Sequence, residues 1–147
     1  MNRKEEKNIL QALLGTSTGN IRMKQTIRQA YDTIDIFIAL IKPDGEIVYI
    51  NRKGKDLLNC NDEELKGTNI ISDFILKGKK AGARDFLRQL AKRKEEGAEE
   101  YTYHFSNEYF DDLAIKAINH VILHNEKKTA AIFITGMKLS PEALNDS

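Results

Sequence analysis

The sequence has few of the features that mark secreted, membrane-spanning or strongly charged proteins. Cys60 is the single cysteine among 147 residues, so no disulfide can form within the chain, and a lone thiol fits a reducing compartment. No apolar run approaches the roughly 18 residues of a membrane-spanning helix. The first residues, Met-Asn-Arg-Lys-Glu-Glu-Lys, are too polar and acidic to lead into a secretion signal. We therefore expect a cytoplasmic protein that makes no membrane contact through this chain.

The whole chain also has almost no excess of positive over negative charge. Lysine and arginine total 23 against 22 for aspartate and glutamate, and a formal net charge of +1 provides no field that would attract nucleic acid. The local exception is residues 77–94, where Asp85 is the single acidic residue. The basic residues of this segment are Lys77, Lys79, Lys80, Arg84, Arg88, Lys92, Arg93 and Lys94. Because no aromatic stacking set is interleaved with them, we interpret the segment as a solvated face and do not expect nucleic-acid binding.

Motifs for catalysis and for metal binding are absent as well. The chain has no G-x-S-x-G, no Walker A and no H-E-x-x-H sequence, and the neighbouring Asp111 and Asp112 fall in a connection typical of a solvated turn. His104, His120 and His124 all fall on predicted strands. The last two share a strand face but lack a nearby third ligand, so we interpret them as partly exposed strand histidines. We expect neither an enzyme nor a metal site.

The most informative stretch that is present covers residues 36–51. Two runs rich in Ile, Val, Tyr and Phe flank Pro43-Asp44-Gly45, which predicts a β-hairpin with strands at residues 36–42 and 46–50. Alternate residues of the first strand are apolar on both faces, so both faces should be covered. Asn51 follows the hairpin and is predicted to cap a short helix that ends before residue 59.

The remaining pattern predicts helices before and after this hairpin and three strands at the end. We expect helices near residues 5–14, 21–33, 62–67, 69–75 and 83–95, with a flexible basic loop at 77–80. Strands are expected near residues 101–106, 113–124 and 129–137, and a last helix is expected to begin at Ser140. Gly67 and Gly97 are expected to end helices.

The helix expected at residues 21–33 carries an apolar stripe that requires a partner surface. Its members are Ile27, Ala30, Tyr31 and Ile34, spaced three and four residues apart. Packing on the chain's own sheet and pairing with a second copy are equally good interpretations. In the second case Ile38 and Leu40, on one face of the first strand, would join the four helical residues in a dimer interface.

The order of strand, turn, strand, short helices, longer helix and three strands resembles a PAS domain. Residues 43–51, Pro-Asp-Gly-Glu-Ile-Val-Tyr-Ile-Asn, are similar to the family's D-G-x-I-x-x-x-N. Residues 56–58, Asp-Leu-Leu, resemble the helix after that asparagine, and residues 63–69, Glu-Glu-Leu-Lys-Gly-Thr-Asn, resemble E-E-L-x-G-x-N.

The expected structural residues are Pro43, Asp44, Gly45, Asn51, Gly67 and Asn69. The resemblance implies an α+β fold, a five-stranded antiparallel sheet with helices on one face, at residues 35–138. Residues 1–34 would be amphipathic helices for capping or dimerisation, and 139–147 would start a helix or linker.

The resemblance also allows this sequence to be compared with family members that bind known ligands. Flavin-photoreceptor members of the family carry a cysteine directly after the asparagine that corresponds to Asn69, but Ile70 occupies that position here. Haem-binding members take a histidine ligand from the long helix, and the helix expected at residues 83–95 contains no histidine. We therefore expect neither a flavin-cysteinyl adduct nor haem, and the cofactor stays unknown. If the domain encloses a ligand cavity, strand alternation and helix periodicity predict its lining. The candidates are Phe37, Ala39, Ile41, Val48, Ile50, Ile70, Phe74, Leu90, Ile132 and Ile134.

Two functions from different classes fit this sequence. The first is a sensory and dimerisation module of a bacterial or archaeal signalling protein, which senses a small molecule or partner and relays the change through its flanking helices to an output domain or partner protein. The second is a ligand-free module that only dimerises or docks a partner.

Overall fold

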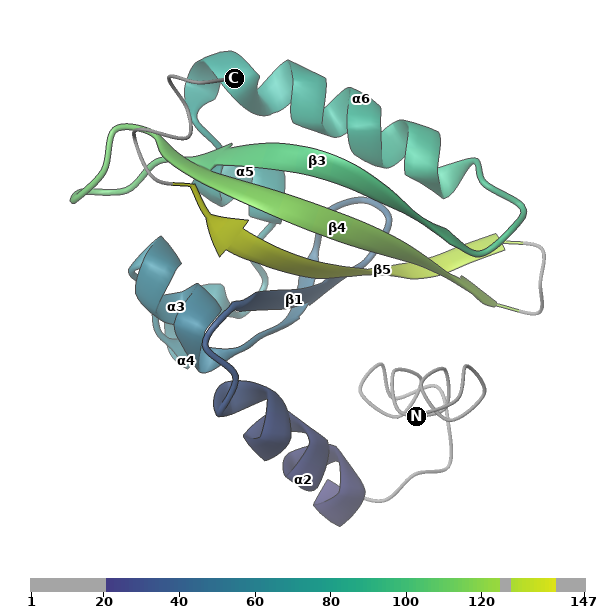
Figure 1. Cartoon of the computed structure of the whole chain (residues 1–147), viewed down its shortest axis with the longest axis horizontal. Coiled ribbons are helices and arrows are strands. Elements are labelled where there is room, and N and C mark those ends of the chain that lie inside the picture. Colours follow the sequence, from purple (N-terminus) through teal and green to yellow (C-terminus); the bar gives the residue numbers. More distant parts are fainter. Residues whose placement is uncertain (1–20, 125–127, 140–147) are drawn as a thin grey trace.

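The computed structural model describes residues 21–124 and 128–139 of the chain. They form one five-stranded antiparallel sheet with helices (Figure 1). The strands are β1 (Phe37–Ile41), β2 (Ile47–Ile50), β3 (Gly97–Phe105), β4 (Leu113–His124) and β5 (Lys128–Lys138), in the spatial order β2-β1-β5-β4-β3. The helices are α2 (Ile21–Asp32), α3 (Arg52–Leu58), α4 (Asp62–Leu65), α5 (Ile70–Phe74), the 3₁₀ turn η1 (Lys77–Lys79) and α6 (Lys80–Ala91). The expected fold class is confirmed.

The predicted hairpin is present, but its second strand contains an irregularity that sequence alternation did not predict. Ile41 pairs with Ile47, whereas the neighbouring Leu40 pairs with Tyr49, so one extra residue, Val48, is accommodated in β2. As a result Ile47 and Ile50 pack into the interior, while Val48 packs with the cluster on the opposite face of the sheet. The expectation that Val48 faces the interior is therefore wrong.

The sheet has an apolar cluster on each face, as the two apolar faces of the first strand predicted. The larger cluster, the interior, lies between the sheet and α3, α4, α5 and α6 and contains Phe37, Ala39 and Ile41 from β1. The smaller cluster, the outer-face cluster, contains Ile38 and Leu40 from β1 and Phe133 from β5, with Ile27 and Tyr31 of α2 packed against it. In Figure 1, α6 runs along the β3 side of the molecule and α2 lies at the opposite, β1 side.

The segment from residue 77 to 80 is helical rather than a flexible loop, which corrects the sequence interpretation. The chain just before it is held to β3, since the Leu76 amide donates to the His104 carbonyl (2.8 Å) and the Ser106 amide donates to the Phe74 carbonyl (2.9 Å). The Lys80 ammonium donates to the carbonyl oxygen of Ser72 (2.8 Å). With its entry fixed in this way, the chain turns through η1 into α6, which begins at Lys80 and ends at Ala91 instead of spanning 83–95.

Strand β3 starts four residues earlier than its alternating pattern indicated. Gly97, Ala98, Glu99 and Glu100 have low intrinsic strand preference, yet each pairs with a residue of β4, from Val121 to Ile118. Pairing with a long neighbouring strand outweighs the local preference here. The bounds of β4 match the prediction, and β5 extends it by one residue at each end. The helices expected at residues 5–14 and after Ser140 lie outside the described residues.

Candidate functional site

Asn51 joins three elements through its side chain and is completely buried. Its carboxamide oxygen accepts hydrogen bonds from the Ile38 amide in β1 (3.0 Å) and from the Gly54 amide in α3 (3.0 Å). Its carboxamide nitrogen donates to the carbonyl oxygens of Tyr31 (3.0 Å), Ile34 (3.3 Å) and Ile36 (2.9 Å). The predicted helix cap is confirmed, and the same side chain also fixes the segment that connects α2 to β1.

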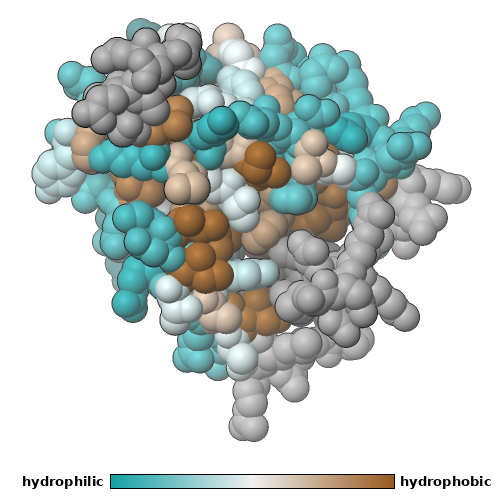
Figure 2. Space-filling model, viewed as in Figure 1, coloured by the Kyte–Doolittle hydropathy of each residue, from teal (hydrophilic) through white to brown (hydrophobic). Residues whose placement is uncertain are grey.

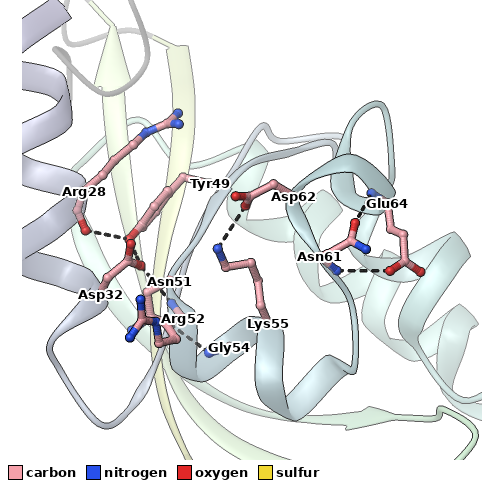
Figure 3. Close-up of polar contacts among 10 residues, drawn as sticks. All are labelled: Arg28, Asp32, Tyr49, Asn51, Arg52, Gly54, Lys55, Asn61, Asp62 and Glu64. Carbon is pink, nitrogen blue, oxygen red and sulfur yellow. Dashed lines mark hydrogen bonds and ion pairs between the residues drawn. The ribbon is translucent and has the colours of Figure 1, made fainter.

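A second set of polar contacts holds α2 against the hairpin (Figure 3). The Tyr49 hydroxyl on β2 donates to the Asp32 carboxylate (2.9 Å) and lies 3.2 Å from the Arg28 carbonyl oxygen, both on α2. The same carboxylate oxygen of Asp32 accepts from the Arg52 amide at the start of α3 (2.8 Å). We call Asp32, Tyr49, Asn51 and Arg52 the α2 latch, because each bonds α2, or the segment that leaves it, to the sheet or α3.

Aromatic and cationic side chains pack around this latch. The Tyr31 ring lies 6.2 Å from the Tyr49 ring and 5.8 Å from the Phe133 ring, between centroids, and the Arg28 guanidinium lies 5.3 Å from the Tyr49 centroid. Burial raises the pKa of the Tyr49 hydroxyl, and the hydrogen bond to Asp32 raises it further. Tyr49 therefore stays protonated and continues to donate to Asp32 across the physiological pH range.

The Pro-Asp-Gly turn is tied to the start of α5. Asp44 accepts a hydrogen bond from the Glu46 amide (2.9 Å), and Gly45 has a φ of +97°, which favours glycine. Asn69 donates to the Asp44 carbonyl (2.9 Å) while its oxygen caps α5 by accepting from the amides of Ile71 and Ser72. Of the structural residues predicted from the sequence, Asp44, Gly45 and Asn69 are thus brought together at this turn. Gly67, with a φ of +76°, follows α4 as expected.

The interior brings together most of the residues predicted to line a ligand cavity. Eight of them are almost fully buried in one cluster, and Phe74 packs against it while remaining partly exposed. The eight are Phe37, Ala39, Ile41, Ile50, Ile70, Leu90, Ile132 and Ile134. They pack beside a series of rings in which the centroids of Phe37 and Phe105 lie 5.6 Å apart and those of Tyr103 and Phe105 5.9 Å apart.

The interior also contains a buried polar pair that the sequence interpretation missed. Tyr103 and Asn119 are both fully buried, and the Tyr103 hydroxyl donates to the Asn119 carboxamide oxygen at 2.5 Å. The Asn119 nitrogen donates to the Glu99 carbonyl (3.0 Å). Burial strongly raises the pKa of the Tyr103 hydroxyl, so it is neutral. Strand alternation could have located this pair, because Asn119 sits between the inward-facing Ala117 and Val121.

Three cavities are lined by described residues, and the first two reach apolar side chains at the margin of this interior. One of about 540 Å³ lies among α2, β2, α4 and the residues around them, and is lined by Arg28, Asp32, Ile47, Val48, Tyr49, Ile50, Lys55, Asp62, Leu65, Lys66 and Gly67. Another of about 420 Å³ lies between the Pro43 turn and α6. A third of about 330 Å³ lies beside Cys60. The first touches the α2 latch directly through Asp32 and Tyr49.

The residues proposed for a dimer interface occupy two different environments. Ile38 and Leu40 are buried beneath Ile27 and Tyr31 of the same chain. Ala30 and Ile34 are exposed. Of the predicted stripe, Ile27 and Tyr31 therefore pack on the chain's own sheet, whereas Ala30 in α2 and Ile34, which follows α2, remain exposed.

The histidines and the cysteine lie apart from one another. His104 bonds the Asp112 carboxylate (2.8 Å), His120 lies against the Phe133 ring (6.5 Å between centroids) and His124 is exposed. Cys60 lies between α3 and α4, and its burial and the Glu64 carboxylate raise its pKa to about 11. Within residues 21–124 and 128–139, no group of three or more His, Cys, Asp or Glu side chains is placed to hold a metal ion. No helix in the same ranges is long and apolar enough to span a bilayer.

Comparisons with known proteins agree on one family. The family model described as PAS fold matches residues 25–126. A PAS domain of an HTR-like protein from Haloarcula marismortui superposes with a TM-score of 0.63 at 10% identity, covering 80% of this chain and 98% of that one. The Rhodobacter sphaeroides LOV protein gives 0.65 at 14% identity, with 86% and 72% covered. The Cronobacter turicensis RpfR quorum-sensing receptor PAS domain gives 0.62 at 12% identity, with 73% and 96% covered. A search of curated proteins found no match.

Proposed function

The chain belongs to the PAS family, and from that premise we propose that it is a sensory and dimerisation module of a signalling protein. It senses a small molecule or a partner, and the change is relayed through its flanking helices to an output domain or partner protein. The described helix in that position is α2.

The observation that carries this proposal is the set of bonds made by Asn51. One buried side chain bonds the end of α2, the start of β1 and the first turn of α3. A shift of α3 relative to the sheet would change these bonds together, because all of them converge on a single carboxamide. A signal can displace α2 by this route only if it binds the latched and released arrangements with different affinity.

Ligands held by structural neighbours support a small molecule as the signal. The RpfR domain is a complex with BDSF, and the Cycle PAS-B domain of Drosophila melanogaster, with a TM-score of 0.59 at 12% identity, holds ethylene glycol. For a ligand in the interior of this chain, we propose contact with the predicted residues that are buried there. These are Phe37, Ala39, Ile41, Ile50, Ile70, Leu90, Ile132 and Ile134, with Phe74 at their margin.

The alternative, a ligand-free interaction module, is favoured by the packing of the interior. Its largest side chains, including Phe37, Tyr103 and Phe105, are fully buried and their rings pack in series. In this case the exposed Ala30 and Ile34 would contribute to a homodimer interface, and Ile27, Tyr31, Ile38 and Leu40 would support it from within the chain.

Native mass spectrometry of the purified chain, compared with its denatured mass, separates the two functions. A retained small molecule supports the sensor, and an unliganded dimer supports the interaction module. Ala30→Arg should shift a dimer to monomer, whereas Gln29→Arg, an exposed neighbour on the same helix, should not. An Ala30→Arg protein that stays dimeric would argue against the α2 interface.

The relay itself is tested by hydrogen exchange. Tyr49→Phe removes the hydroxyl that bonds Asp32 and should speed amide exchange in α2 while leaving β3 and β4 unchanged. Tyr101→Phe is the matched control, because no hydrogen bond of the Tyr101 hydroxyl is present within the described part of the chain. Unchanged exchange in α2 of Tyr49→Phe would show that the Tyr49–Asp32 hydrogen bond does not hold this helix.

A further inference from the structure

The cavity of about 540 Å³ beside the α2 latch has the composition of a ligand site at the edge of the sheet. It lies on the flank of the edge strand β2, with α2 on one side and α4 on the other. In Figure 3, Arg28, Tyr49 and Asp32 stand on the α2 side, and the Lys55–Asp62 pair stands on the α4 side. Its volume falls within the range of about 300–1,000 Å³ typical of small-molecule sites.

Positively charged side chains outnumber negatively charged ones in the lining of this cavity. Its two carboxylates are already engaged: Asp32 accepts from the Tyr49 hydroxyl and the Arg52 amide, and Asp62 pairs with the Lys55 ammonium (2.9 Å). Arg28 and Lys66, by contrast, form no ion pair with any described residue. The excess charge lining the cavity is therefore positive.

Arg28 provides the most specific feature of the site. Its Nε is covered by neighbouring atoms and has no hydrogen-bond partner, an uncommon state for a buried donor. The guanidinium lies over the Tyr49 ring, 5.3 Å from its centroid, so rotation away from the ring would present Nε and a terminal nitrogen toward the cavity. Two parallel N–H groups of this kind match a carboxylate in a bidentate pair.

The remaining lining determines what the carboxylate is attached to. Ile47, Val48 and Leu65 supply apolar surface to the cavity, while Lys66 provides a second positive charge. An inorganic anion would leave this apolar surface without contact. We propose that the cavity binds a small organic carboxylate with an apolar body, its carboxylate paired with Arg28 and its body against β2 and α4.

Such a ligand would bridge α2, which carries Arg28, to the segment after α4, which carries Lys66. It would hold α2 in its latched position, so the regulatory consequence rests on the function proposed above. Binding itself does not rest on it, because Arg28 and Lys66, which would hold the carboxylate, lie outside the interior.

The test is isothermal titration of the full chain with hexanoate and benzoate, with hexanamide as the uncharged analogue. Wild type should bind the carboxylates and bind hexanamide at least tenfold more weakly. Arg28→Gln should weaken carboxylate binding at least tenfold, and Lys66→Gln should weaken it to a smaller extent. Arg84→Gln, which removes an exposed cation of α6 outside this cavity, should bind like wild type. Thermal melts of each variant check that it is folded.

Three outcomes would overturn the site: no carboxylate binding by wild type, equal binding of hexanamide, or unchanged binding by folded Arg28→Gln. Hydrogen exchange of α2 with and without hexanoate then separates this inference from the proposed function. Slower exchange in α2 supports both the site and the relay. Carboxylate binding with unchanged α2 exchange supports the site and contradicts its link to the relay. Failure of binding while Tyr49→Phe still loosens α2 rejects the site and leaves the proposed function standing.

Discussion

The side-chain nitrogen of Asn51 donates a hydrogen bond to the main-chain carbonyl of Tyr31, 3.0 Å away and 20 positions earlier in the chain. Asn51 therefore does more than cap a helix, and its replacement should be unusually costly. Asn51→Ala removes, within a fully buried site, the two hydrogen bonds that the side chain accepts from the amides of Ile38 and Gly54 and the three that it donates to main-chain carbonyls. We expect the free energy of unfolding to fall by about 3 kcal/mol.

Asn61 provides the matched control for this prediction. It caps α4 in the same way, with its oxygen accepting from the Glu64 amide (2.9 Å), but it is exposed and makes no long-range bond among the described contacts. Asn61→Ala should cost about 1 kcal/mol, the ordinary value for a cap. Urea denaturation of both variants measures the difference. Equal losses would mean that the long-range bonds of Asn51 add nothing to capping.

Local sequence signals predicted the elements that are determined locally. Pro43-Asp44-Gly45 predicted the hairpin, and Asn51 predicted the start of α3, because a turn or cap is made by neighbouring residues. The start of β3 and the helical path of residues 77–80 could not be predicted in this way. They depend on pairing with β4 and on bonds to β3, which join residues distant in sequence.

The candidate site was predictable to a similar degree. Alternation identified the inward residues of β1 and the last strand, but the irregularity at Val48 reversed the direction of one candidate. The cavity beside Arg28 draws its lining from α2, β2, α4 and their surroundings, and no spacing along the chain brings these together. The two roles of Tyr49, in the latch and in that cavity, likewise depend on the position of α2.

Alanine substitutions at two helical glycines should change the stability of the fold in opposite directions. At Gly54 in α3, an added Cβ would lie 2.4 Å from a methyl group of the buried Ile50 and 3.3 Å from the Phe37 ring. At Gly82 in α6, it would meet only the Tyr101 hydroxyl at an ordinary 3.5 Å. We expect Gly54→Ala to destabilise the fold by about 1–3 kcal/mol through overpacking.

Gly82→Ala should instead stabilise the fold by about 0.5–1 kcal/mol, because alanine has the higher helix propensity and no close neighbour opposes it. Both values come from the same chemical denaturation series. A stabilising Gly54→Ala would show that the contact between α3 and β2 can open without cost.

The buried Tyr103–Asn119 pair predicts a non-additive double mutant. Tyr103→Phe leaves the buried Asn119 oxygen without its donor and should cost about 1–3 kcal/mol. Adding Asn119→Leu removes the unsatisfied oxygen. The double variant should therefore lose less free energy of unfolding than the sum of the losses of the two single variants. A double-mutant cycle by urea denaturation measures this coupling. Strict additivity would indicate that the hydroxyl and the carboxamide act independently.

The thiol of Cys60 should react slowly at neutral pH although its side chain is partly accessible. Its pKa is raised from 9.0 to about 11, chiefly by burial and then by the negative charge of Glu64. Since the thiolate is the reactive form, a rise of this size lowers its population at pH 8 by roughly 100-fold relative to an unperturbed thiol. The alkylation rate of the folded protein by iodoacetamide should therefore keep increasing with pH past 9, instead of reaching a plateau there.

Glu64→Gln identifies the electrostatic part of this shift. Removing the negative charge lowers the pKa of Cys60, so alkylation at pH 8 should be faster than in wild type, while the glutamine oxygen can still accept the hydrogen bond from the Asn61 amide. Glu63→Gln removes the adjacent exposed charge, which does not contribute to the shift, and should leave the rate unchanged. If both variants react at the wild-type rate, burial alone protects the thiol. A rate plateau near pH 9 in wild type would instead mean that Cys60 lies in a more open site than the packing between α3 and α4 provides.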